Sequence, residues 1–194
     1  MTILRFLSIC LILQLVALPS AIHAEDAVAS PPVVVMETTL GDITIELYPD
    51  KAPVTVSNFL AYVDRGYYDG TVFHRVIPNF MAQGGGFDPK MQPKATAAPI
   101  VNEADNGLRN ERGTIAMART NNPDSATSQF FINLRANAPL DWSRSNPGYA
   151  VFGKVIDGMA TVDAMATKPT GQVSRYRDVP LEPIIINKAR RQAQ

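Results

Sequence analysis

The sequence predicts a mainly β protein, with one domain folded as a closed or nearly closed antiparallel β-barrel with helical caps. Three observations support this prediction. Short strand-like segments recur along the chain, Gly, Pro and Asn residues separate them, and only two segments have a helical pattern. Periodicity alone leaves the number of strands open.

The amino-terminal residues predict a secretory signal peptide. Arg5 supplies a positive charge, an apolar run follows over 6–18, and Ala24 offers a small residue for cleavage. The run is short for a membrane span, which needs about 20 residues. We expect cleavage after Ala24, with an uncleaved anchor as the alternative. The mature protein would then be periplasmic or secreted, without stable membrane association.

A flexible, polar lead-in over 25–32 precedes the first predicted pair of strands. In VVVMETTLGDITIELYP, the turn signal LGD separates two strand-like runs. The alternation predicts a hairpin with one buried face, made by Val33, Val35, Ile43, Ile45 and Leu47.

The next segment, KAPVTVSNFLAYVDRG, predicts a helix. Pro53 suits its first turn and Gly66 suits its end. Four apolar residues spaced for one helical face would pack against the barrel, namely Val56, Phe59, Leu60 and Val63.

Strand-like segments then return, and one short helix interrupts them. The predicted strands are TVFHRVI, FMAQGG, TIAMA, SQFFINL, AVFGKVI and PIIINKA, and the helix covers 159–166 with Met159, Val162 and Met165 on one side. The stretch 87–99 contains three prolines and predicts a surface loop. The folded domain would therefore cover 33–189 and a tail 190–194.

Composition and charge exclude several classes of function. The 194 residues carry a formal net charge of +0, so no polybasic surface for nucleic acid is expected, and the basic end KARRQ is interpreted as a solvated tail. Cys10 and His23 leave with the signal peptide, and His74 then remains as the single histidine. Disulfides, zinc sites built on Cys and His, and thiolate catalysis are excluded, and we expect no metal and no cofactor.

The stretch FHRVIPNFMAQGGG places Arg75 among apolar residues. A charge in such surroundings is costly to desolvate, so Arg75 is either paired or functional. A lone histidine in a strand, as His74 would be, is more often a hydrogen-bonded core residue than a catalyst. Gly84 to Gly86 indicate a tight turn or a close backbone approach rather than a phosphate loop.

Alternation along SQFFINL separates two faces of one strand. Phe130, Ile132 and Leu134 would belong to the core, whereas Gln129, Phe131 and Asn133 would share the other face. Met81 and Gln83 also share a face, with Phe80 on the opposite side if the segment is a regular strand. An amide beside an aromatic ring is typical of a pocket wall, although a half-buried barrel surface would give the same pattern.

FHRVIPNFMAQGGG, followed in order by RGTIAMAR, SQFFI and YAVFGKVIDGM, resembles the cyclophilin family of peptidyl-prolyl cis-trans isomerases. The segment NEADNGLRNERGTIAMARTNNPDSATSQFFINL is similar to sequences of the bacterial exported branch of this family. The resemblance runs from about Val33 to Ile186 and implies an eight-stranded antiparallel barrel closed by two helices. It implies isomerisation of X-Pro bonds in proline-containing segments of unfolded or folding exported proteins.

The resemblance also implies roles for individual residues. Arg75 and Gln83 would be the catalytic residues, with Arg75 acting electrostatically and without a covalent intermediate. The substrate-binding residues would be Phe80, Met81, Phe131 and Leu140 around the proline ring, Ala118, Arg119 and Thr120 along the substrate backbone, and Gln129 and Tyr149 nearby.

Two departures from the family pattern affect these expectations. Pro139 stands where the family commonly has tryptophan or phenylalanine, and Trp142 is too far along the chain to replace it. Cyclosporin binding is therefore in doubt, because that aromatic residue helps to hold the drug. Many eukaryotic members also have Asn-Ala where this chain has Arg119 and Thr120. Two other function classes stay open, a module that binds proline segments without turnover and a lipocalin-like carrier of a small ligand.

Overall fold

The computed structural model describes residues 30–193. The predicted signal peptide and most of the predicted lead-in lie outside the described residues. No helix within 30–193 is long and apolar enough to cross a membrane.

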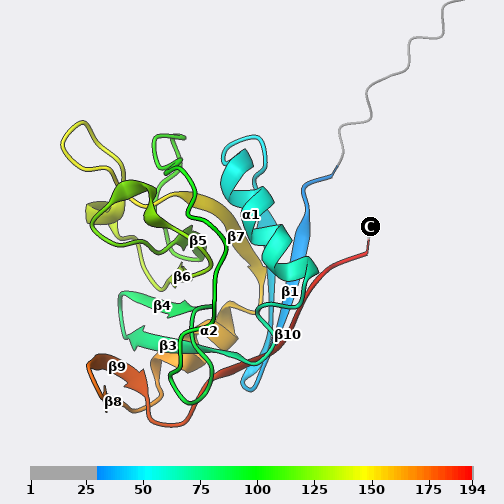
Figure 1. The fold of residues 1–194 in the computed structure, drawn as a ribbon, viewed down its shortest axis with the longest axis vertical. Helices are drawn as coiled ribbons and strands as arrows, with labels where there is room; N and C mark the ends of the chain where they lie inside the picture. Colours follow the sequence, from blue (N-terminus) through cyan, green and yellow to red (C-terminus); the bar gives the residue numbers. More distant parts are fainter. Residues whose placement is uncertain (1–29, 194) are drawn as a thin grey trace, which may run out of the picture.

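Eight antiparallel strands close a barrel in the order β1-β10-β3-β4-β6-β5-β7-β2 (Figure 1). Two α-helices accompany them, so the predicted fold class is confirmed for the described residues. The barrel strands are β1 (Val33–Thr38), β2 (Gly41–Leu47), β3 (Thr71–Ile77), β4 (Met81–Gly84), β5 (Thr114–Met117), β6 (Phe130–Asn133), β7 (Val151–Asp157) and β10 (Ile185–Arg191). The helices are α1 (Pro53–Asp64) and α2 (Met159–Ala166), with short 3-10 turns η1 (Pro123–Ser125) and η2 (Ala138–Leu140).

The first hairpin forms as predicted, but its buried face differs on β1. Val34 pairs with Ile45 and Met36 pairs with Ile43, and all four side chains are fully buried. The prediction that Val33 and Val35 share this face is therefore wrong. Because VVVM is apolar at every position, either alternate set could face inward, and the turn before Gly41 fixes the register.

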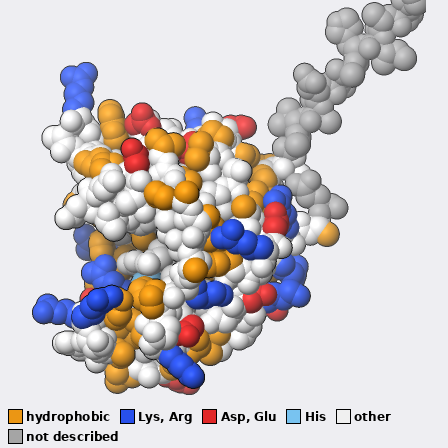
Figure 2. Space-filling model, viewed as in Figure 1, with side chains coloured by type: hydrophobic (Ala, Val, Ile, Leu, Met, Phe, Trp, Pro, Cys, Tyr) orange, Lys and Arg blue, Asp and Glu red, His pale blue; other side chains and the backbone are white. Residues whose placement is uncertain are grey.

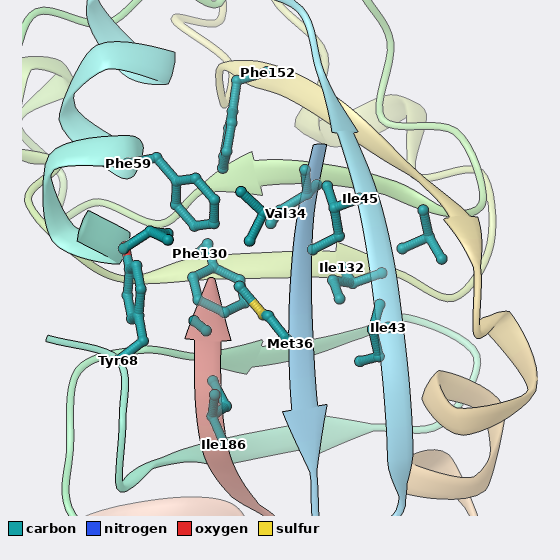
Figure 3. Close-up of a cluster of buried hydrophobic side chains, with 14 of the residues drawn as sticks. Val34, Met36, Ile43, Ile45, Phe59, Tyr68, Phe130, Ile132, Phe152 and Ile186 are labelled. Carbon is teal, nitrogen blue, oxygen red and sulfur yellow. The ribbon is translucent and has the colours of Figure 1, made fainter. Parts of the chain in front are cut away.

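The two helices complete the core inside the barrel. Phe59 of α1 points inward, and its ring centroid lies 5.3 Å from that of Tyr68 and 5.1 Å from that of Phe152 (Figure 3). Val162 and Met165 of α2 join the same cluster. The start of α1 is stabilised by a distant carboxylate, because Glu103 accepts hydrogen bonds from the backbone N–H groups of Val54 and Thr55. Side chains thus fill the barrel interior, as expected for a small barrel.

A second, two-stranded sheet lies outside the barrel and was not predicted. It consists of β8 (Thr170–Val173) and β9 (Tyr176–Pro180), and it lies beside β3 (Figure 1). Its sequence, TGQVSRYRDVP, is mostly polar and is buried only at Val179 and Pro180, so it lacks the apolar alternation that indicates a strand. This small sheet carries a carboxylate that contacts the candidate site.

The carboxyl-terminal strand extends beyond the predicted domain boundary. Arg190 and Arg191 belong to β10, where Arg191 is opposite Val34, so the tail does not begin at residue 190. Arg190 forms an ion pair with Glu37 at 3.1 Å, and Arg191 donates to Asp64 at 2.7 Å. These basic residues are therefore paired with carboxylates of the barrel and of α1.

Candidate active site

The candidate site crosses the outer face of four neighbouring strands. Arg75 of β3 is opposite Gln83 of β4, Gln83 is opposite Phe131 of β6, and Phe131 is opposite Ala116 of β5. Residues that pair in register point to the same face of a sheet. The alternation predicted for SQFFINL is confirmed, because Phe130 and Ile132 belong to the interior core and Phe131 to a separate small cluster.

A pocket of about 120 Å³ lies on this face. Nine of the eleven predicted site residues line it, and the described part of the chain adds no other lining residue. They are Arg75, Phe80, Met81, Gln83, Ala118, Arg119, Phe131, Leu140 and Tyr149. The other two, Thr120 and Gln129, line an adjoining pocket of about 180 Å³ that shares Gln83, Ala118 and Arg119 with the first.

The floor of the first pocket is apolar and well packed. Met81 and Phe131 are buried together with Ala116 and Val151, and Leu140 and Tyr149 pack against this cluster. The rings of Phe131 and Tyr149 meet edge to face at 5.7 Å between centroids. Such a floor suits a small apolar ring, while Arg75 and Gln83 supply hydrogen-bond donors at its rim.

Phe80 lies in the pocket because it precedes the strand. Asn79 adopts a left-handed conformation (φ 56°) and β4 begins at Met81, so strand alternation does not apply to Phe80. Two hydrogen bonds stabilise this turn: Nδ2 of Asn137 donates to the backbone carbonyl of Phe80 at 2.9 Å and to Oδ1 of Asn133 at 2.7 Å. No pattern in the sequence predicts that Asn137 makes these two hydrogen bonds.

Arg75 has one carboxylate partner. Its Nε lies 3.5 Å from Oδ2 of Asp178 on β9, and its side chain is 42% exposed. No other ion pair involves Arg75 in residues 30–193, so the two terminal nitrogens are not engaged by a carboxylate. The interaction is partly exposed and long for an ion pair, and it leaves the fork of the guanidinium available at the pocket.

Gln83 and Gln129 connect the two adjoining pockets. Nε2 of Gln83 donates to Oε1 of Gln129 at 2.9 Å. A Cβ atom at Gly86 would lie 2.5 Å from Cγ of Gln129, and Gly85 has a φ of 80°. The close approach and the turn predicted for the glycine run are both confirmed.

His74 is a core residue, as predicted, but it is not fully hydrogen-bonded. It is 5% exposed, its ring lies 4.6 Å from that of Phe87, and Nδ1 has no hydrogen-bond partner among the described residues. Burial lowers the pKa of His74 from 6.5 to about 4; the charge of Arg75 acts in the same direction, and interactions with the Val72 backbone and the Gln129 side chain oppose the shift. At neutral pH the imidazole is therefore uncharged and adds no positive charge next to Arg75.

Arg119 is fixed at the rim of the pocket by carbonyl groups. Its Nη2 donates to the carbonyl of Gly148 at 2.8 Å, its Nη1 donates to that of Thr120 at 2.8 Å, and its guanidinium lies 4.4 Å from the centre of the Tyr149 ring. Pro139 on η2 is exposed and does not line the pocket, nor does Trp142, which is 49% exposed.

Comparison with known proteins identifies related sequences and folds. The family model "Cyclophilin type peptidyl-prolyl cis-trans isomerase/CLD" matches residues 33–191. A peptidyl-prolyl cis-trans isomerase of Acinetobacter baylyi is 61% identical over 151 residues, which are 78% of this chain and 80% of that protein. Peptidyl-prolyl cis-trans isomerase B of Escherichia coli is 53% identical over 156 residues, which are 79% of this chain and 95% of that protein. The crystal structure of a cyclophilin type isomerase from Cryptosporidium parvum superposes with a TM-score of 0.72 at 30% identity, covering 84% of this chain and 99% of that one.

Proposed function

The chain belongs to the cyclophilin family of peptidyl-prolyl cis-trans isomerases, and from this membership we propose that Arg75 is its catalytic residue and that its substrates are exported proteins. The activity itself follows from the family, so the protein is an isomerase of X-Pro bonds. The proposal concerns how the reaction is accelerated and where it is used.

The reaction requires no nucleophile, because no covalent bond breaks. Rotation about a peptide C–N bond faces a barrier of about 18–20 kcal/mol, which arises from its partial double-bond character. As the bond twists, the lone pair of the proline nitrogen localises on that atom. A donor aimed at this lone pair stabilises the twisted state more than either planar state, and only such differential binding accelerates the step.

The position of Arg75 is the observation that supports this role most directly. Its side chain lines the pocket together with Met81 and Phe131, and its ion pair with Asp178 involves Nε rather than the terminal nitrogens. A guanidinium carries a positive charge and presents its donors in a rigid fork. With the proline ring on the apolar floor, that fork can donate to the imide nitrogen.

The size of the effect is consistent with a single charge and a fitted pocket. A rate increase of about five decades corresponds to about 7 kcal/mol. A preorganised charge at the imide nitrogen would supply about half of this amount. Fixing the proline ring and the neighbouring backbone, the role we propose for Phe131, Gln83 and the segment 118–120, would supply the rest.

Replacing Arg75 tests the catalytic role. Arg75→Ala should lower kcat/KM for an X-Pro peptide by more than a hundredfold without unfolding the protein. Arg75→Lys should also be poor, because a point charge lacks the fork. Exposed Arg144, which lines neither pocket, provides the matched control Arg144→Ala, and this variant should keep full activity. An Arg75→Ala enzyme with more than half of the normal activity would contradict the role.

A role in the folding of exported proteins is supported by the predicted signal peptide and by the resemblance to the exported branch of the family. Uncatalysed X-Pro isomerisation takes tens to hundreds of seconds and can limit folding, so an isomerase would benefit proteins that refold after translocation. Mass spectrometry of the protein from the periplasm should give a chain that begins at Glu25. A full-length chain retained in the cytoplasm would contradict the proposal.

Two further expectations concern ligands. A lipocalin-like carrier role does not fit, because the barrel core is filled by side chains such as Phe59, Phe130 and Phe152. We expect weak binding of cyclosporin, since Pro139 is exposed and contributes no ring to the pocket. Titration calorimetry with cyclosporin would measure this, and tight binding would show that the aromatic residue is dispensable.

A further inference from the structure

A third hollow lies beside the proline pocket, on the side of the molecule where β9 runs. This groove has a volume of about 510 Å³. It shares Arg75, Gln83 and Arg119 with the pocket of about 120 Å³ described above, which we call the proline pocket. Figure 2 shows basic side chains gathered on the side where Figure 1 places β8 and β9. A peptide whose proline occupies the pocket would therefore have this groove within reach of its neighbouring residues.

The groove carries an excess of positive charge. Four arginines and one carboxylate line it, so the local charge is 4 − 1 = +3. The arginines are Arg75, Arg119, Arg175 and Arg177, and the carboxylate is that of Asp178. Asp178 is paired with Arg75, and no carboxylate within residues 30–193 forms an ion pair with the other three. The whole chain has a net charge of +0, so this excess is a local property of the groove.

One of these arginines, Arg175, lies against a pair of packed aromatic rings that line the groove. Nη2 of Arg175 donates to the hydroxyl of Tyr176 at 3.0 Å, and its guanidinium lies 5.2 Å from the centre of that ring. The Tyr176 ring meets the buried Phe87 ring at 5.0 Å between centroids. Arg119, which also lines the groove, is held by the backbone carbonyls of Gly148 and Thr120, so its guanidinium loses little freedom when a ligand binds.

We propose that this groove binds a carboxylate of the substrate chain, so that the enzyme prefers X-Pro segments with an aspartate or glutamate close to the proline. Guanidinium groups recognise carboxylates through paired, charge-assisted hydrogen bonds. Because an extended chain advances about 3.3–3.6 Å per residue, a side chain within about three residues of the proline can reach a groove that shares Arg75 with the pocket. The inference rests on the isomerase function of the site, for which it specifies a class of substrate.

A peptide series tests the inference directly. Single Glu, Gln or Lys residues are placed at each of the three positions before and after one X-Pro unit, and kcat/KM is measured by NMR exchange, which needs no coupling protease. At low salt, the Glu peptide should exceed the Gln peptide by about fivefold at one or more positions, and Lys should fall below Gln. At about 0.5 M salt the difference should shrink, because the charges are screened.

Variants of the groove then locate the effect. The double variant Arg175→Gln, Arg177→Gln should bring the ratio of Glu to Gln peptides close to one. The matched double variant Lys51→Gln, Lys188→Gln removes the same charge from exposed residues that do not line the groove, and it should keep the ratio. Circular dichroism verifies folding, and the single variant Arg177→Gln should show a partial loss if the double variant unfolds.

The outcomes separate the inference from the function on which it rests. Equal rates for Glu and Gln peptides at every position would overturn the acidic preference while leaving the isomerase intact. A preference that survives in the groove variant, or that disappears in the Lys51 and Lys188 control, would also overturn it, since the effect would then come from elsewhere. Failure to isomerise any peptide would instead contradict the isomerase function.

Discussion

Mild acidification should destabilise this protein through the protonation of His74. Burial lowers the pKa of His74 to about 4, whereas in the unfolded chain it returns to the ordinary 6.5. Between these two values the unfolded state binds more protons than the folded state, so stability falls as pH decreases. The contribution is complete above pH 6.5, declines through the window from 6.5 to 4, and is fully lost below it.

The magnitude follows from the two pKa values. Each tenfold change in proton affinity corresponds to about 1.36 kcal/mol, so the complete loss is about 3 kcal/mol. A change from pH 7 to pH 5 already removes about 2 kcal/mol of the free energy of unfolding. Asp64, whose pKa the hydrogen bond from Arg191 holds below its ordinary 3.8, loses its charge only at lower pH and does not obscure this window.

Urea unfolding followed by circular dichroism at several pH values between 7 and 4.5 would measure the effect. The variant His74→Phe keeps a ring against Phe87 and cannot be protonated, so its unfolding free energy should vary less with pH over this range. The difference between the two proteins should change by about 2 kcal/mol between pH 7 and pH 5. Parallel curves for the two proteins would refute the assignment of this effect to His74.

Two other substitutions test features around the site. Asp178→Asn keeps a residue that tolerates the left-handed backbone at φ 59° but removes the charge that holds Nε of Arg75. A half-exposed pair is worth at most about 1 kcal/mol, so kcat/KM for an uncharged peptide should fall about two- to fivefold; no change, or a hundredfold loss, would contradict a positioning role. Gly85→Ala should destabilise the protein by about 3 kcal/mol, because φ is 80° and the new Cβ would lie 2.8 Å from the rings of Tyr68 and Phe130. Gly107 has φ 81° and open space around it, so Gly107→Ala should cost only about 1 kcal/mol in thermal unfolding, and equal losses would show that crowding at Gly85 is unimportant.

Local patterns in the sequence were sufficient to predict the positions of the barrel strands and of α1. Alternating segments such as SQFFINL and the helix stripe with Phe59 carry their information within a few residues, and the structure places them as predicted. The pattern of VVVM was insufficient, because every position is apolar and only the register with β2 selects Val34 and Met36. The polar hairpin of β8 and β9 lacked apolar periodicity altogether.

In the candidate site, too, some residues could be predicted from local sequence and others could not. Motif resemblance located the nine residues that line the proline pocket, because they fall in contiguous, distinctive segments. Asp178 could not be found in this way, since it contacts Arg75 from a strand far along the chain and stands in a polar segment outside the quoted motifs. The neutral state of His74 also depends on burial between distant segments, which no local pattern encodes.

The order of the strands has a consequence for how the chain acquires its structure during synthesis. β10 (Ile185–Arg191) lies between β1 and β3, so both of those strands have an unpaired edge until this late strand has left the ribosome. Pairing between the two ends of a chain is slow to form, because it must close the longest possible loop. The ring of hydrogen bonds can therefore be completed only after β10 has been synthesised, and until then the barrel of the nascent chain stays open.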